Sequence, residues 1–251
     1  MGYRSVSFVF SLFIGAMVLI SSGCDRHEDK LIVYAGKGLK AVVQDIVHSF
    51  EQRYGVEVVV VYGGSQTILS TLKKTEKGDI FIPGGLQYVE EAGDLVAYYK
   101  VVAKHRLTVA VRSDNGKNIN SFQDLARSGI SLAIGNKGTC AIGTTTEELL
   151  KRAGNSHDYL ENVAIRASTA NELLDLVIQG EVDAVITHDH MLKLAKSKDL
   201  RRVDIPASLV KAHEIPLAVL RVSENRQIAE LFSSFVEKEG QQIFKKHGFG
   251  G

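Results

Sequence analysis

The sequence predicts an α/β protein whose mainly parallel sheets are flanked by helices on both faces. From Leu31 onward, short apolar runs alternate with longer segments of helical periodicity, an alternation that is typical of parallel sheets. The run Val56–Tyr62 is almost continuously apolar and rich in valine, which indicates a strand buried on both faces. The sequence contains neither an internal repeat nor a low-complexity linker. The alternation of strand-like and helix-like segments therefore extends from residue 31 through the rest of the sequence.

In the first half of the chain, a short apolar run predicts each strand and a spacing of three to four residues predicts each helix. We expect strands at Leu31–Ala35, Val56–Tyr62, Ile80–Ile82 and Arg106–Val111. We expect helices at Leu39–Arg53, Thr67–Lys74, Leu86–Ala92 and Ser121–Ala126. Tyr98 and Tyr99 fall in a stretch that we expect to be helix or loop.

In the second half, two capping boxes mark helix starts. Thr144 to Glu148 is expected to begin a helix that reaches about Ala153, and Thr169 with Glu172 begins one that reaches Gln179. A final helix is expected from about Asn225 to Lys246. The strands of this half are expected at Ser131–Ile134, Val163–Ala167, Val182–Thr187 and Ile215–Val222.

Two of the expected strands end in glycines and pass directly into a helix, at Gly36–Gly38 and at Gly63–Gly64. The carboxyl ends of parallel strands lie at one edge of a sheet, where ligands of α/β proteins bind. A helix that starts at this edge directs unpaired backbone N–H groups toward it. The sequence therefore predicts an anion site at the edge.

Residues 1–23 have the character of an export signal. Arg4 is their only charge and the run Val6–Ile20 is largely apolar. Such a run is shorter than the ~20 residues that span a membrane, and it is typical of a signal peptide. The predicted protein is therefore exported, with residues 24–30 as a tether before the folded part.

The segment around Cys24 resembles a bacterial lipoprotein signal. Small residues precede the cysteine, although that family usually has leucine where Ser21 stands. The resemblance implies lipidation of Cys24, and Asp25 implies retention at the periplasmic face of the inner membrane in a host with two membranes. In a host with one membrane, the tethered domain would lie on the outer face. An ordinary secretory signal with an incidental cysteine remains the alternative.

Composition excludes several classes of protein. The 251 residues carry 30 Lys and Arg against 29 Asp and Glu, and no basic stripe indicates binding to nucleic acid. The chain has two cysteines, Cys24 and Cys140, which exclude a disulfide framework. No second apolar run approaches the length of a membrane span.

With its elements placed, the chain resembles the molybdate- and tungstate-binding receptors of ABC importers, a branch of the type II periplasmic binding proteins. The segments that carry the resemblance are YAGKGLKAVVQDIVHSFEQRYGVEV, VYGGSQTILSTLKK, GDIFIPG, RLTVAVRS, GNKGTCAIGTTTEELLKRAG, GEVDAVIT, EIPLAVL and QQIFKKHGF. The resemblance implies two lobes that close on a ligand about a hinge. One lobe would contain residues 31–108 and 218–251, and the other residues 109–217. Crossing strands would lie near Leu107–Val111 and Pro216–Leu220.

The resemblance also implies where a tetrahedral oxyanion would be held, by backbone N–H groups and a few hydroxyls at helix N-termini. The first family position is a serine, here replaced by Gly38, and the preceding Lys37 offers a cation or is a solvated loop lysine. The second family serine matches Ser65, next to Gly64, with a simple helix cap as the alternative. The third and fourth positions are backbone contacts, matched by Ile142 and Ala170.

The fifth family position is a tyrosine hydroxyl, here replaced by His188. An imidazole donates one hydrogen bond to an oxyanion, or two when charged. The motif His188-Asp189-His190 also suggests a metal site. If the strand continued through it, the two histidines would offer only two nitrogens where a closed site needs four ligands. We therefore predict no metal ligand, and a structural or surface histidine pair remains the alternative. Cys140 is expected to be a small, partly buried residue.

The resemblance implies a binding protein without a cofactor and not an enzyme. Its partners would be a small oxyanion, the membrane permease of an ABC importer and, through Cys24, the membrane, with no nucleic acid. We expect a monomer. Receptors for another anion (phosphate, sulfate or a carboxylate), for iron or another metal ion, and a ligand-sensing domain remain alternatives. An exported phosphate-ester hydrolase is disfavoured, because no Gly-x-Ser-x-Gly elbow, phosphate loop or metal-ligand cluster is present in the sequence.

Overall fold

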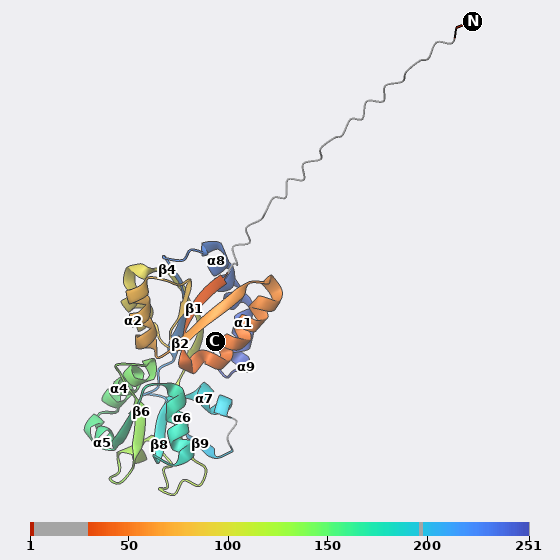
Figure 1. The fold of residues 1–251 in the computed structure, drawn as a ribbon. Coiled ribbons are helices and arrows are strands. Elements are labelled where there is room, and N and C mark those ends of the chain that lie inside the picture. Colours follow the sequence, from red (N-terminus) through yellow and green to blue (C-terminus); the bar gives the residue numbers. More distant parts are fainter. Residues whose placement is uncertain (3–29, 196–197, 251) are drawn as a thin grey trace.

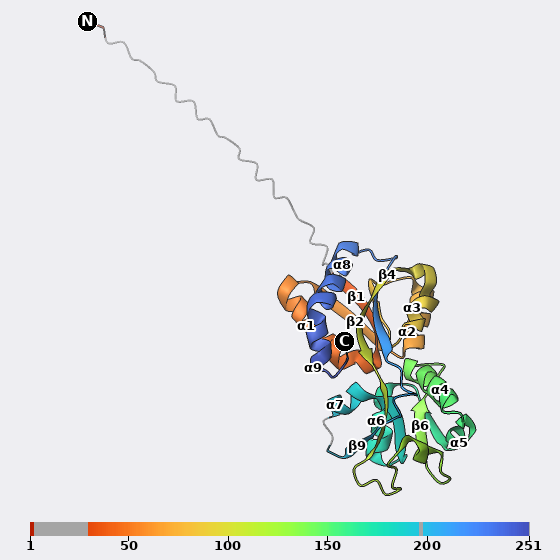
Figure 2. The same ribbon diagram turned by 180° about the vertical axis from the view of Figure 1, so that it is seen from behind.

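The computed structural model describes residues 1–2, 30–195 and 198–250. The predicted lipidation site Cys24 and all but the first two residues of the predicted signal peptide lie outside the described residues. The described part forms two lobes, each built on one five-stranded sheet (Figure 1), and Figure 2 shows the same lobes from behind. No helix within these ranges is long and apolar enough to cross a membrane.

The sheet of the first lobe has the strand order β2-β1-β3-β10-β4. β1 is parallel to β2 and β3, whereas β10 is antiparallel to both of its neighbours. The sheet is therefore mixed, with β10 running against the other four strands. Its strands are β1 (Lys30–Gly36), β2 (Glu57–Gly63), β3 (Ile80–Ile82), β4 (Val96–His105) and β10 (His213–Leu220).

The sheet of the second lobe repeats this arrangement with the order β7-β6-β8-β5-β9. β6 is parallel to β7 and β8, and β5 is antiparallel to its neighbours β8 and β9. In both sheets, the parallel strands therefore end at a common edge. The strands are β5 (Leu107–Arg112), β6 (Leu132–Gly135), β7 (Val163–Ala167), β8 (Ala184–His188) and β9 (Leu200–Val203).

Helices cover both faces of the first sheet. Alternate residues of β1 point to opposite faces, so that Val33 packs with α1, α8 and α9, and Tyr34 packs with α2 and α3. Figure 1 shows α1 and α2 on opposite sides of the sheet. The helical segments of this lobe are η1 (Lys37–Leu39), α1 (Lys40–Tyr54), α2 (Ser65–Thr75), α3 (Gln87–Ala92), η2 (Gly93–Leu95), α8 (Arg226–Phe235), η4 (Val236–Gly240) and α9 (Gln241–Lys246).

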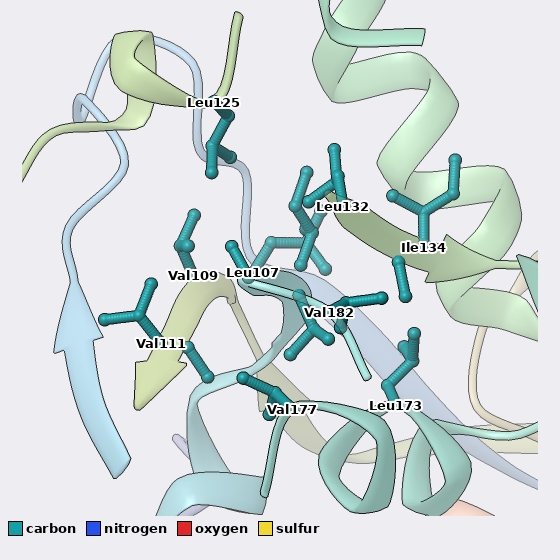
Figure 3. Close-up of a cluster of buried hydrophobic side chains, with 14 of the residues drawn as sticks. Leu107, Val109, Val111, Leu125, Leu132, Ile134, Leu173, Val177 and Val182 are labelled. Carbon is teal, nitrogen blue, oxygen red and sulfur yellow. The ribbon is translucent and has the colours of Figure 1, made fainter. Parts of the chain in front are cut away.

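The second lobe has one large apolar core and a small separate cluster of Ala170, Leu174 and Met191. Figure 3 shows part of the large core, in which side chains of β5 and β6 meet Leu173 and Val177 of α6. These residues are fully buried, so the core fixes α6 against the sheet. The helical segments of this lobe are η3 (Phe122–Ala126), α4 (Ala141–Ala153), α5 (Ser156–Glu161), α6 (Ala170–Gln179) and α7 (Asp189–Ala195).

The chain crosses between the lobes twice, between β4 and β5 and between β9 and β10. The expected crossing strand Leu107–Val111 instead pairs wholly within the second sheet. The other, Pro216–Leu220, lies within the first sheet. Because β10 begins to pair with β4 at His213, residues 213–217 belong to the first sheet and not to the second lobe, where the sequence placed them.

Other sequence-based expectations are corrected by the structure. Tyr98 and Tyr99 lie in strand β4 and not in a helix or loop, because their segment pairs with β10. The helix expected to start at Thr144 starts at Ala141, with Cys140 as its N-cap. The helix expected at Ser121–Ala126 is a short 3-10 helix at Phe122–Ala126, which begins with a capping box formed by Ser121 and Asp124.

Candidate functional site

A cavity of about 40 Å³ lies between the two lobes. The ends of β1 and β2 line it from the first lobe, and the segments that follow β6, β7 and β8 line it from the second. Its volume admits a small ion or a few water molecules. The residues expected from the sequence to bind a ligand all line this one cavity, namely Lys37, Gly38, Gly64, Ser65, Ile142, Ala170 and His188. Their contact with a ligand stays a prediction.

Three helices begin at the cavity. Their N-caps are Gly64 for α2, Cys140 for α4 and Thr169 for α6, and all three residues line the cavity. No side chain caps the first turn of α2 or α4. Helix N-termini carry a partial positive charge on their free N–H groups. Among the described residues that line the cavity, none is acidic, so its electrostatics favour an anion.

Ser65 is the first residue of α2 and is only 4% exposed. Its Oγ accepts a hydrogen bond from the backbone N–H of Gly84 (3.0 Å). The hydroxyl proton therefore remains available to donate to a group in the cavity. The alternative that Ser65 merely caps the helix is wrong, because Gly64 holds that position.

Backbone groups from the two lobes touch at the rim of the cavity. The N–H of Gln66 donates a hydrogen bond to the carbonyl oxygen of Thr139 (3.3 Å). A methyl group at Gly64 would overlap that carbonyl oxygen, and one at Gly84 would lie 3.2 Å from the Cβ of Ala141. The absence of side chains at these glycines thus lets the lobes approach closely, and the structure is in a closed form.

Two of the other expected contacts, Ile142 and Ala170, lie at the starts of α4 and α6. Ala170 is the first residue of α6 and Ile142 the second of α4, and both are buried, so they can offer backbone N–H groups. Lys37 and Gly38 lie in η1, which leads into α1. Lys37 is exposed, so its ammonium group can also remain in water.

Three histidines meet at the cavity, and the sequence indicated only two of them. His188 ends β8, His190 lies in α7, and His105 ends β4 of the first lobe. One ligand nitrogen of each lies within 4.8 Å of the others. The rings of His105 and His188 stack at 3.6 Å, and the ring of His190 stacks on Phe249 at 3.8 Å. No local motif links His105 to the other two, because β4 itself was not expected.

The strand does not continue through the His188-Asp189-His190 motif. β8 ends at His188 and α7 begins at Asp189, so the two histidines do not alternate along one strand. The carboxylate of Asp189 accepts hydrogen bonds from the backbone N–H groups of Arg106 (3.3 Å) and His190 (2.9 Å).

Burial keeps these histidines neutral. It lowers the pKa of His105 and of His188 well below the ordinary value, and neighbouring imidazoles add to the effect. Burial lowers the pKa of His190 to about 3. A fourth ring, that of His213, lies 6.4 Å from His105, and burial lowers its pKa as well. Near neutral pH, each ring therefore offers one N–H donor and one lone pair.

Cys140, expected to be partly buried, is only 6% exposed and is a free thiol. Its Sγ lies 3.6 Å from the carbonyl oxygen of Asn136. Burial raises the pKa of the thiol, so the group is a poor nucleophile and packs as a small apolar residue.

Comparison with known proteins gives a consistent result. A family model described as bacterial extracellular solute-binding protein matches residues 31–250. A putative binding protein of Haemophilus influenzae is 31% identical over 217 residues, which cover 85% of this chain and 83% of that protein. The molybdate-binding protein ModA of Escherichia coli is 24% identical over 252 residues, covering 95% of this chain and 96% of that protein.

A solved structure has a similar fold. The sulfate-binding protein SubI from Mycobacterium tuberculosis superimposes with a TM-score of 0.75. The match covers 88% of this chain and 86% of SubI at 19% sequence identity. At this identity the likeness concerns the fold alone.

Proposed function

The chain belongs to the family of bacterial extracellular solute-binding proteins, and from this we propose that it captures a tetrahedral oxyanion, with molybdate or tungstate as the leading candidates. The two-lobed α/β fold of type II periplasmic binding proteins, expected from the sequence, is confirmed. The proposal concerns the ligand, the contacts that hold it and the partner that receives it.

One observation carries the proposal: three helix N-termini and the hydroxyl of Ser65 converge on a small cavity whose described lining has no carboxylate. Fixed N–H dipoles replace the hydration shell of a dianion at little cost, because they need no reorientation on binding. A carboxylate in the same place would repel the anion. The arrangement therefore selects negative charge without a formal countercharge.

Each lining group has a distinct role in this proposal. The backbone N–H groups of Gly38, Ile142 and Ala170 donate to oxygen atoms of the anion, and Ser65 donates its hydroxyl proton. His188 takes the place of a tyrosine hydroxyl in the related molybdate receptors. As a neutral imidazole, it donates one hydrogen bond. Lys37 at the rim attracts the anion electrostatically.

The size of the cavity limits the ligand to a small ion in the closed form. A volume of about 40 Å³ leaves no room for a sugar or an amino acid beside the anionic group. Sulfate and phosphate are the second candidates, because a protein of the same fold binds sulfate. Choice among these ions depends on small differences in oxygen-to-oxygen distance within the closed cavity.

The family also suggests the setting in which the receptor works. We propose that the protein is exported, that Cys24 tethers it to the membrane, and that it acts as a monomer. The closed form would deliver its anion to the permease of an ABC importer. A sensing partner in place of a permease is the alternative. The family is one of binding proteins, and we expect no catalysed reaction.

Thermal unfolding with separate anions tests the proposal. The purified protein would be heated with molybdate, tungstate, sulfate or phosphate. A ligand at ~1,000 times its Kd adds about 4 kcal/mol to the free energy of unfolding, which raises Tm by several degrees. We expect the largest shift with molybdate or tungstate.

A matched pair of variants tests whether the rise in Tm comes from an anion bound in the cavity. Ser65→Ala should reduce it, whereas Ser70→Ala, on the exposed side of the same helix, should not. Ser70 donates only to the carbonyl oxygen of Gln66. A shift with sulfate or phosphate alone would replace the molybdate proposal, and no shift with any anion would end it.

A further inference from the structure

The histidines at the cavity come from both lobes. His105 is the last residue of β4, His188 is the last residue of β8, and His190 follows two residues later in α7. Nitrogen atoms of all three lie within 4.8 Å of one another. All three side chains are at least 95% buried, and each also lines the cavity.

Most ring nitrogens of this cluster have no hydrogen-bond partner in the described structure. Both nitrogens of His105, both of His190 and Nε2 of His188 are buried without a hydrogen-bond partner. The backbones of Gly84 and Gly38 lie near His105 and His190, without reaching hydrogen-bond geometry. A buried polar atom without a hydrogen-bond partner destabilises the fold, because it has lost its bonds to water. A cluster of such atoms is therefore unfavourable unless a ligand satisfies them.

Packing alone does not explain the residue type. The stacked rings of His105 and His188 would pack as well if they were phenylalanine, as the neighbouring Phe249 does against His190. Phenylalanine would leave no nitrogen unpaired. The common property of the three side chains is thus a free nitrogen directed at a shared space.

Neutral imidazole nitrogens are ligands for divalent transition metals such as Zn²⁺, Co²⁺, Ni²⁺ and Cu²⁺. Hard cations such as Ca²⁺ and Mg²⁺ require oxygen ligands, and no carboxylate is among the described residues lining the cavity.

We propose that His105, His188 and His190 form a site for a divalent transition-metal ion, with three nitrogen ligands and the remaining coordination position open to the cavity. Three protein ligands with one open position are the pattern of exchangeable metal sites. Metal–nitrogen bonds of about 2.1 Å place ligand nitrogens roughly 3.4 Å apart in a tetrahedral site. The rings would thus turn inward by a small amount, and no hydrogen bond holds them back.

The site goes beyond the proposed oxyanion function and does not depend on it. A metal there would join the lobes, since His105 belongs to the first sheet and His188 to the second. The helix N-termini at the same cavity oppose a cation, so the open position is expected to hold hydroxide or another anion that offsets this repulsion.

Metal titration tests the site directly. The purified protein, without a histidine tag and stripped of metal by a chelator, would be titrated with Co²⁺ and then with Zn²⁺. We expect one equivalent of Co²⁺ to give the intense visible absorption of low-coordinate cobalt, and Zn²⁺ to abolish it by displacement. Absence of saturable binding by calorimetry with either ion would overturn the proposal.

Substitution of single histidines identifies the side chains that bind the metal. His105→Gln, His188→Gln and His190→Gln should each weaken Zn²⁺ binding by about 100-fold or more, since even outer-shell changes cost 10- to 100-fold. The control is His157→Gln, because the side chain of His157 is 81% exposed and its ring pairs with Glu161. Unchanged affinity in all three cluster variants would overturn the site.

Two further measurements serve as controls. The first needs no variant that could fail to fold, and the second separates metal binding from anion binding. In the unaltered protein, nitrogen NMR of the imidazole rings should show shifts at three histidines on addition of Zn²⁺. Shifts at other histidines would overturn the assignment. Ser65→Ala should keep Zn²⁺ binding even where it loses anion binding, so failure of one proposal leaves the other open to test.

Discussion

The backbone N–H of Gln66 in the first lobe donates a hydrogen bond to the carbonyl oxygen of Thr139 in the second (3.3 Å). The hydrogen bond lies beside Gly64, whose missing side chain lets the carbonyl group approach. Closure of the lobes and the anion cavity therefore depend on the same few backbone atoms. A change at this contact should alter binding without disturbing the core of either lobe.

The first prediction concerns Gly64→Ala. The added methyl group would overlap the carbonyl oxygen of Thr139, which is backbone and cannot turn away. Such overlap costs about 1–3 kcal/mol, so the closed form should be disfavoured and anion affinity should fall by about 10- to 100-fold. Calorimetry measures the affinity, and X-ray scattering with and without anion measures closure.

Gly38→Ala is the matched control for this change. Its methyl group would meet the Cβ of Ala170 at 3.4 Å, an ordinary contact, and the backbone N–H of residue 38 remains. Affinity should stay within about threefold of the original protein. Equal losses in the two variants would show that closure at Gly64 is not the cause.

The second prediction concerns the pH dependence of Cys140 alkylation. Burial raises the pKa of this thiol, so less thiolate is present at a given pH than in an unburied cysteine. Because the thiolate is the nucleophile, alkylation should be slow at pH 7 to 8 and should rise at a higher pH than for free cysteine. Mass spectrometry at several pH values measures the rate, with glutathione as the reference thiol. A rate equal to that of glutathione would contradict the burial.

Much of the fold could be predicted from the sequence. Strands with a continuous apolar run, such as β1 and β2, were placed to within one residue at either end, because such a run is a local signal. The expected burial of β2 on both faces is wrong, since β2 lies at the edge of its sheet and only its Val58 is buried. Strand β4 was not, because Tyr98, Lys100 and Lys104 break its apolar character. Its conformation depends on pairing with β10, more than 100 residues away, which no local pattern reveals.

The same limit applies to the site. Gly64 and Ser65 could be placed at the cavity because a strand, two glycines and a helix follow one another in the sequence. His105 could not, because it reaches His188 only through the pairing of β4 with β10 and of β5 with β8. The motif alone offered two nitrogens where a closed metal site needs four ligands, and the tertiary structure adds a third nitrogen from His105.

The third prediction concerns Asp79, a carboxylate that is only 3% exposed. It accepts hydrogen bonds from the backbone N–H of Ile32 (2.7 Å) and from the hydroxyl of Ser223 (2.5 Å). Asp79→Ala would leave both donors unpaired, so the free energy of unfolding should fall by about 3 kcal/mol. Urea denaturation measures it, with exposed Asp94→Ala as the control. A loss no larger than that of the control would contradict this role.

The fourth prediction concerns Phe249, whose ring packs against the histidine cluster. Its ring stacks on His190 at 3.8 Å and meets Phe244 edge-on at 5.3 Å, and it is only 4% exposed. The next residue, Gly250, exchanges two backbone hydrogen bonds of 2.8 Å with Lys104. These contacts hold the end of the chain against β4, directly beside His105.

Phe249→Ala should lower the free energy of unfolding by about 3–5 kcal/mol, because it removes a buried ring and leaves a cavity. Phe249→Leu keeps most of the apolar volume and should cost about 1 kcal/mol. Urea denaturation of both variants measures the difference. Hydrogen exchange should then show faster exchange at Lys104 in the alanine variant, since its N–H donates to the carbonyl oxygen of Gly250. Equal stability of the alanine variant and the original protein would mean that the end of the chain contributes nothing to the packing around His105 and His190.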